Sequence, residues 1–112
     1  LIELARRHPD VPLICGHTGG TWELGIRAVR AYPKIYVDLA GSDPVNGFVE
    51  MAVKELGASR VLYGSDCGGR SFASQLGKVY GAQITEEERK QILGQNLKQL
   101  LAPILRAKGW KE

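Results

Sequence analysis

The chain has 112 residues, the length of one ordinary domain, and its composition of 44% hydrophobic and 24% charged residues is typical of a folded globular protein. This composition argues against disorder, and no apolar run approaches the roughly 20 residues that a membrane-spanning helix needs. The net charge of +3 is spread along the chain and lacks the basic stripe with interleaved aromatics of a nucleic-acid-binding surface.

The first residues carry the spacing of a helix. Leu1, Leu4 and Ala5 repeat at the helical period, and the chain has no initiator methionine. We therefore expect the last turns of a helix here, in a sequence that begins inside a longer polypeptide.

Three short apolar runs recur at similar intervals along the chain. They occupy residues 12–15, 35–40 and 60–63. Short buried strands alternating with helical patterns are typical of βα units that feed a parallel sheet. The sequence therefore predicts an α/β fold with three parallel strands.

Helical patterns fill the intervals between these runs. Residues 21–33 begin at Thr21, a residue type favoured as an N-cap, and carry apolar side chains at i, i+4 and i+7 before Pro33. Residues 45–56 show a longer apolar stripe and are followed by Gly57, as is common at helix C-termini. We predict one helix in each interval.

The last third of the chain also reads as helical. A glycine-rich loop at residues 64–70 leads to a predicted helix around residues 72–80. Thr85 and Glu88 have the spacing of a capping box, which predicts another helix start. An apolar stripe then continues almost to the end of the chain, and we expect Gly94 to separate two helices there.

Three βα units are too few to close a TIM barrel, which takes eight units and about 250 residues. The chain is therefore either a small open α/β domain or the C-terminal three-eighths of a TIM (β/α)8 barrel. A barrel segment alone leaves sheet edges and apolar helix surface exposed, so we expect it to form a homo-oligomer.

Polar residues follow the predicted strands where a parallel α/β fold builds its site. The first strand runs into His17 and the third into Asp66, which places both on one rim, two strands apart. Imidazole and carboxylate are ligands that Zn²⁺ accepts in catalytic sites. Zinc lowers the pKa of water to about 7, and a nearby carboxylate can take its proton. The sequence therefore predicts that His17 and Asp66 are both metal ligands and catalytic residues.

Each of these residues also has a structural interpretation. His17 is of a residue type that often caps a helix, and Asp66 is of a type that often serves as an N-cap. Asp38 lies inside the second strand, so we interpret it as structural, facing a barrel interior or pairing with a neighbouring strand. Cys15 and Cys67 are interpreted as small hydrophobic residues, although Cys67 adjoins Asp66.

Four strings in the chain carry a resemblance to a known family. In order, they are HPDVPLICGHTGG, IYVDLAG, RVLYGSD and ILGQNLKQLL. Together they resemble the C-terminal part of the amidohydrolase-related (amidohydrolase 2) TIM-barrel proteins, the group that includes aminocarboxymuconate-semialdehyde decarboxylase. The resemblance covers nearly the whole chain and implies that residues 1–112 are the C-terminal part of such a barrel domain.

The resemblance also implies roles for the candidate residues. In that family a His follows the sixth strand in an H-x-G-G context, matched by His17, and an Asp follows the eighth strand in a G-S-D context, matched by Asp66. Asp66 would be a metal ligand and the proton acceptor for the attacking water. His17 would bind a second metal, orient the water or polarise the substrate. The family's first-strand H-x-H pair and fifth-strand His are absent here, and we expect them upstream of Leu1.

The sequence thus favours a metal-dependent hydrolase that acts on a small-molecule substrate through metal-activated water, with zinc as the expected divalent metal. The loop at residues 67–69 departs from the family's commoner aromatic and proline residues, so the substrate stays open. A non-oxidative decarboxylase, a lyase of the same superfamily, is the first alternative. A non-catalytic α/β fragment that needs a partner is the second, and a phosphate-binding domain using the glycine-rich residues 16–21 is the third. We expect the fragment alone to be inactive.

With only two cysteines the chain has no disulfide framework, so we expect a cytoplasmic protein. We also expect neither nucleic acid nor membrane among its partners.

Overall fold

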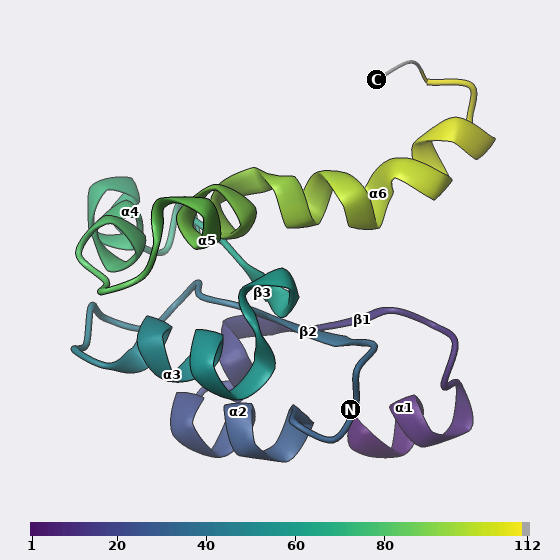
Figure 1. Ribbon diagram of the computed structural model, residues 1–112, viewed down its shortest axis with the longest axis horizontal. Coiled ribbons are helices and arrows are strands. Elements are labelled where there is room, and N and C mark those ends of the chain that lie inside the picture. Colours follow the sequence, from purple (N-terminus) through teal and green to yellow (C-terminus); the bar gives the residue numbers. More distant parts are fainter. Residues whose placement is uncertain (111–112) are drawn as a thin grey trace.

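The three predicted strands form one parallel sheet. The computed structural model describes residues 1–110, and in it the strands lie in the order β1-β2-β3 (Figure 1). Their bounds are β1 Leu13–Cys15, β2 Ile35–Asp38 and β3 Val61–Leu62. Cys15 pairs with Val37, and Val37 pairs with Val61, so these three buried side chains form one row across the sheet. All three strand predictions are confirmed, although each strand is shorter than its apolar run.

Helices lie on both sides of the sheet. In Figure 1, α1, α2 and α3 lie along one side, whereas α4, α5 and α6 lie along the other. The bounds are α1 Ile2–Arg7, α2 Trp22–Val29, α3 Phe48–Leu56, α4 Phe72–Tyr80, α5 Glu86–Lys90 and α6 Asn96–Ala107. Short 3₁₀ turns occur at Gly16–Gly19 and Ala58–Arg60.

Two expected helix boundaries differ from the structure. The helix predicted over residues 45–56 begins at Phe48, because Gly47 has a left-handed backbone with φ of 87° and occupies the N-cap position. Gly94 does not separate two helices. Gln91–Gln95 form a π-helical turn that joins α5 to α6 in one continuous helical run. The expected capping box is confirmed, because Thr85 and Glu88 each accept the other's backbone N–H.

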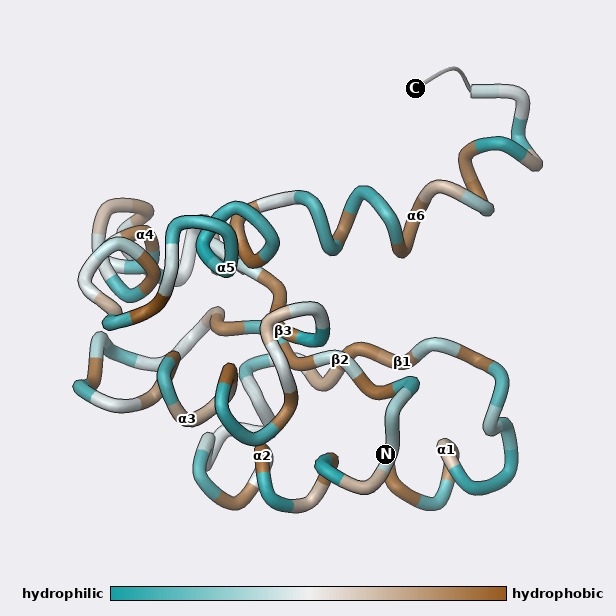
Figure 2. The backbone as a smooth tube through the Cα atoms, viewed as in Figure 1, coloured by the Kyte–Doolittle hydropathy of each residue, from teal (hydrophilic) through white to brown (hydrophobic). Residues whose placement is uncertain are grey.

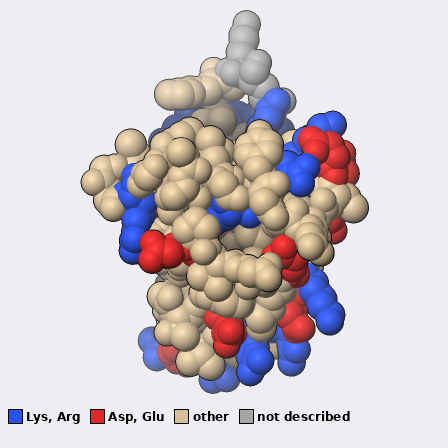
Figure 3. All heavy atoms as spheres, turned by 90° about the vertical axis from the view of Figure 1, so that its left-hand side faces the viewer, with Lys and Arg blue, Asp and Glu red and all other residues tan. Residues whose placement is uncertain are grey.

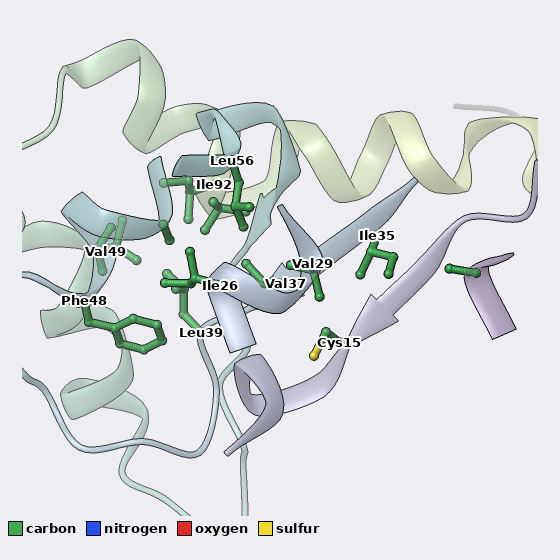
Figure 4. Close-up of a cluster of buried hydrophobic side chains, with 14 residues drawn as sticks. Cys15, Ile26, Val29, Ile35, Val37, Leu39, Phe48, Val49, Leu56 and Ile92 are labelled. Atoms are coloured by element: carbon green, nitrogen blue, oxygen red, sulfur yellow. The ribbon is translucent and has the colours of Figure 1, made fainter. Parts of the chain in front are cut away.

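Most of the core lies between the sheet and the helices α1, α2 and α3, and Val79 of α4 and Ile92 of the π-helical turn also belong to it. Figure 4 shows side chains from several of these elements converging, and Figure 2 shows hydrophobic segments in the strands. The buried apolar cluster consists of Ala5, Cys15, Ile26, Val29, Ile35, Val37, Leu39, Phe48, Val49, Ala52, Leu56, Val61, Val79 and Ile92. Burial of this cluster is the main favourable contribution to folding.

Two polar side chains, the half-buried Arg60 and the buried Asn96, bind backbone carbonyls around this core. Arg60 donates hydrogen bonds to the carbonyls of Val29, Tyr32 and Ile35 at 2.8–2.9 Å, and so joins the start of β3 to the segment that links α2 to β2. Burial lowers the pKa of its guanidinium. The Asn96 amide donates to the carbonyls of Ala58 and Val61 at 2.7 and 2.8 Å. These contacts fix β3 between the two helical layers.

Both outer strands have one neighbour only, and apolar surface is exposed beside them. Ile14 on β1 is 46% exposed, and Leu24 on α2 is 64% exposed. A closed barrel would cover such positions with further strands and helices. Within residues 1–110, no helix is long and apolar enough to cross a membrane.

Candidate active site

The carboxyl ends of the three strands meet at one edge of the sheet, and His17 lies just beyond β1. The backbone of His17 and Thr18 has φ of 52° and 48°, a conformation that non-glycine residues seldom adopt. Two contacts hold it there. Asp38 accepts the backbone N–H of His17 at 2.9 Å through Oδ1, and the buried Thr18 hydroxyl donates to the Asp38 carbonyl. The end of β2 therefore fixes the turn that presents His17.

The imidazole of His17 lies against Gly41, in the loop after β2. A Cβ added to Gly41 would lie 2.5 Å from Nδ1 of His17, and Gly41 has φ of 82°. Only glycine combines this backbone with so close an approach. Gly41 is thus the surface on which the imidazole rests.

Asp66 lies beyond β3 in a tight turn of its own. Its backbone has φ of 48°, and its carbonyl accepts the N–H groups of Gly69 and Arg70, both at 2.9 Å. The helix that follows begins later, at Phe72 with Ser71 as its N-cap residue. Asp66 is therefore not an N-cap, and its carboxylate is free to face the site.

The structure brings the two predicted residues together. Nε2 of His17 lies 3.8 Å from Oδ1 of Asp66, with side chains that are 54% and 30% exposed. The expectation that they share one rim is confirmed, whereas their catalytic and metal-binding roles stay predictions. Two donors on one tetrahedral zinc ion are about 3.4 Å apart, given metal–ligand distances near 2.0–2.1 Å. The observed spacing and donor types fit one shared divalent ion.

The described residues contain no group of three or more His, Cys, Asp or Glu side chains arranged for a metal ion. Catalytic zinc sites take three protein ligands, so the pair of His17 and Asp66 would not by itself complete such a site.

Asp38 supports the site from the middle strand. Oδ1 accepts the backbone N–H groups of His17 and Ala40, at 2.9 and 3.0 Å. No ion pair of Asp38 occurs within residues 1–110, so the expected salt bridge to a neighbouring strand is not found there. Its structural interpretation agrees with these contacts. The sequence did not predict that Asp38 binds the backbone of His17.

The two cysteines differ. Cys15 is buried, and burial, together with the nearby charge of Asp38, raises the pKa of its thiol, so it behaves as a small core residue. Cys67, beside Asp66, is exposed, which contradicts its interpretation as a small buried hydrophobic residue. The glycine-rich turn lifts it out of the core.

Cationic side chains also reach this edge of the sheet. Arg70 pairs with Asp43 at 2.7 Å and links the loops after β3 and β2. Lys78 of α4 is 6% exposed, and its pKa is lowered by burial first and by Arg70 second. Figure 3 views the molecule from the left of Figure 1, where β2 runs into its loop, and shows acidic and basic groups interspersed on that face. Lys78 was missed because a lysine in an amphipathic helix usually reads as solvent-exposed.

Comparison with known proteins bears on this arrangement. Amidohydrolase 2 from Bifidobacterium longum subsp. infantis is 20% identical, with a TM-score of 0.69, over 89% of this chain and 43% of that one. An amidohydrolase from Burkholderia multivorans with bound zinc is 17% identical, with a TM-score of 0.73, over 89% and 47%.

A dihydroxybenzoic acid decarboxylase from Polaromonas, with bound manganese and the inhibitor 2-nitroresorcinol, has 19% identity and a TM-score of 0.70, over 92% of this chain and 36% of that one. The chain thus spans less than half of each of these three structures. No curated protein matches it.

These similarities show the fold, and they confirm the expected parallel βα units of a TIM barrel in preference to a small open domain. The family model for the amidohydrolases matches residues 1–101. By that match, the chain belongs to the amidohydrolase family.

Proposed function

We propose that His17 and Asp66 are two ligands of a catalytic divalent metal centre in an enzyme that hydrolyses a small-molecule substrate. One observation carries this proposal: Nε2 of His17 and Oδ1 of Asp66 lie 3.8 Å apart on an accessible rim, each held by a dedicated turn. Membership of the amidohydrolase family supports it, as does the zinc bound in the related Burkholderia structure.

His17 and Asp66 have different roles in this proposal. When bound, a divalent ion such as zinc lowers the pKa of water to about 7 and polarises a substrate oxygen. His17 contributes Nε2 as a neutral donor, in an orientation that Gly41 and Asp38 maintain. Asp66 contributes Oδ1, and its second oxygen, Oδ2, takes the proton of the attacking water and returns it to the leaving group.

The remaining donors come from βα units outside this chain, either in a longer polypeptide or in partner subunits. The open edges of β1 and β3 and the exposed Ile14 and Leu24 are the surfaces that such units would cover. A homo-oligomer is one way to cover them.

A second candidate function is non-oxidative decarboxylation. The observation in its favour is that the Polaromonas decarboxylase matches this chain as well as the amidohydrolases do, with a TM-score of 0.70. In that reaction the bond to the carboxylate breaks, the electron pair stays on the substrate carbon, and a proton must reach that carbon. Asp66 is the group on this rim that can deliver it.

Turnover by the protein purified from the organism that makes it tests the proposal. The zinc-loaded protein is assayed with esters, lactones and amides for hydrolysis, and with hydroxybenzoates for CO₂ release. We expect hydrolysis, with a loss of at least about 100-fold in Asp66→Asn and in His17→Asn, because each removes a group that acts at the reacting atoms.

The matched control is Asp43→Asn, which removes an exposed carboxylate of the neighbouring loop that pairs with Arg70. We expect it to retain most of the activity. Full turnover in Asp66→Asn would refute the proposal, and CO₂ release without hydrolysis would favour the second function.

A further inference from the structure

A buried lysine of α4 contacts the end of β2. Nζ of Lys78 donates to the Leu39 carbonyl at 2.6 Å and to Oε1 of Gln75 at 2.7 Å, and it lies 5.8 Å from the centre of the Phe48 ring. Removing an ammonium group from water is unfavourable unless hydrogen bonds replace its hydration. No carboxylate within the described residues forms an ion pair with Lys78. Its position is therefore defined by the carbonyl at the end of β2.

Gln75, one helical turn earlier, holds the other end of the same loop. Its side chain is 1% exposed, and Nε2 donates to the Ser42 carbonyl at 3.4 Å and to the Ser74 hydroxyl at 3.2 Å. Lys78 and Gln75 thus bind the first and last carbonyls of residues 39–42, and they bind one another.

Gly41 lies inside this doubly held loop, and the imidazole of His17 rests on it. A Cβ at Gly41 would meet Nδ1, Cγ and Cε1 of His17 at 2.5, 2.7 and 2.8 Å. A displacement of the loop toward β1 would push the ring, and a displacement away would leave it without support. The position of His17 relative to Asp66 therefore depends on residues 39–42.

We propose that Lys78 and Gln75 are positioning residues for His17, acting through the 39–42 loop on which its imidazole rests. The catalytic importance of this positioning rests on the proposed function of His17, whereas the contacts that position the imidazole do not depend on it. Because α4 follows Asp66 in the chain, Lys78 and Gln75 connect the segment after Asp66 to the loop that supports His17. Two packed elements joined by defined hydrogen bonds are a physical basis for such coupling.

The test observes the imidazole directly. In ¹H–¹³C spectra at one fixed pH, the ring signals of His17 and His8 are identified by their loss in His17→Gln and His8→Gln, and the His8 ring serves as an internal reference. In Lys78→Met the side chain keeps its length but cannot donate to Leu39. We expect the His17 ring signals to shift or broaden by more than a line width, while those of His8 stay in place.

The control is Lys54→Met, which makes the same change at an exposed position of α3. It should leave both rings unchanged. Unmoved His17 signals in folded Lys78→Met would overturn the proposal and would assign the lysine a stabilising role alone.

A second variant covers the case in which Lys78→Met does not fold. Gln75→Glu keeps an acceptor for Lys78 but places a carboxylate oxygen against the Ser42 carbonyl. It should move the His17 ring signals, and a melting temperature that changes while those signals stay fixed would overturn the proposal. Failure of the metal proposal would appear separately, as a wild-type protein in which added metal leaves His17 unaffected.

Discussion

Gly41→Ala is the change that most sharply tests how the site is built. The added Cβ would lie 2.5 Å from Nδ1 of His17, whereas ordinary carbon contacts begin near 3.4 Å. The imidazole must therefore retreat by about 1 Å, and a misplacement of that size can lower a catalytic rate about 100-fold. Alanine at φ of 82° also destabilises the fold by about 1–2 kcal/mol.

Gly57→Ala separates these two effects. Gly57 also has a positive φ, of 83°, but the nearest atom to an added Cβ is Oγ of Ser59, at 4.0 Å, so the variant carries backbone strain without touching His17. We expect both variants to lose stability in urea unfolding and only Gly41→Ala to lose turnover. Equal turnover in the two variants would refute the idea that Gly41 determines the position of the imidazole.

Three further predictions concern buried polar groups. Asn96→Leu removes the amide donor to the carbonyls of Ala58 and Val61, although the Ala58 carbonyl keeps the backbone N–H of Val61, and it should lower the free energy of unfolding by about 1–3 kcal/mol in urea titrations; a loss below about 0.5 kcal/mol would contradict this. The buried Tyr63 hydroxyl has no hydrogen-bond partner among residues 1–110, so Tyr63→Phe should raise the melting temperature or leave it unchanged, and a clear decrease would contradict this. Burial lowers the pKa of Lys78, so the folded state binds fewer protons than the unfolded state just below the ordinary value of 10.5. The stability of the wild-type protein relative to Lys78→Met should therefore rise as the pH rises toward 10.5. A fall in its relative melting temperature over the same pH range would contradict this prediction.

The order of elements was predictable because hydrophobic periodicity reports burial directly. Residues 12–15, 35–40 and 60–63 are mainly apolar, as in parallel strands whose two faces are both covered in the complete fold, and their regular recurrence indicated parallel strands. Parallel strands share one carboxyl edge, so the placement of His17 and Asp66 on one rim followed from topology, whereas their separation of 3.8 Å depends on the turns that hold them.

Other features depend on tertiary context that periodicity does not contain. Gly94 has low intrinsic helix propensity, but Ile92 beside it is buried and its carbonyl accepts the N–H of Tyr63, so packing maintains a π-helical turn there. Lys78 and Gln75 are polar residues on a helix, and only the position of residues 39–42 shows that their partners are carbonyls. Further ligands for the proposed metal are not found among residues 1–110.

Paramagnetic broadening by Mn²⁺ tests the metal centre most directly, because it detects binding that is too weak for calorimetry. Two donors do not close a site, so we expect the 112-residue chain to bind divalent metals more weakly than micromolar. Substoichiometric Mn²⁺ should broaden the His17 ring and the amide signals of residues 65–69 before the His8 ring, and Asp66→Asn should abolish this preference. Broadening confined to other acidic positions, such as residues 86–88, with sharp His17 signals would contradict the assignment of His17 and Asp66 as metal ligands.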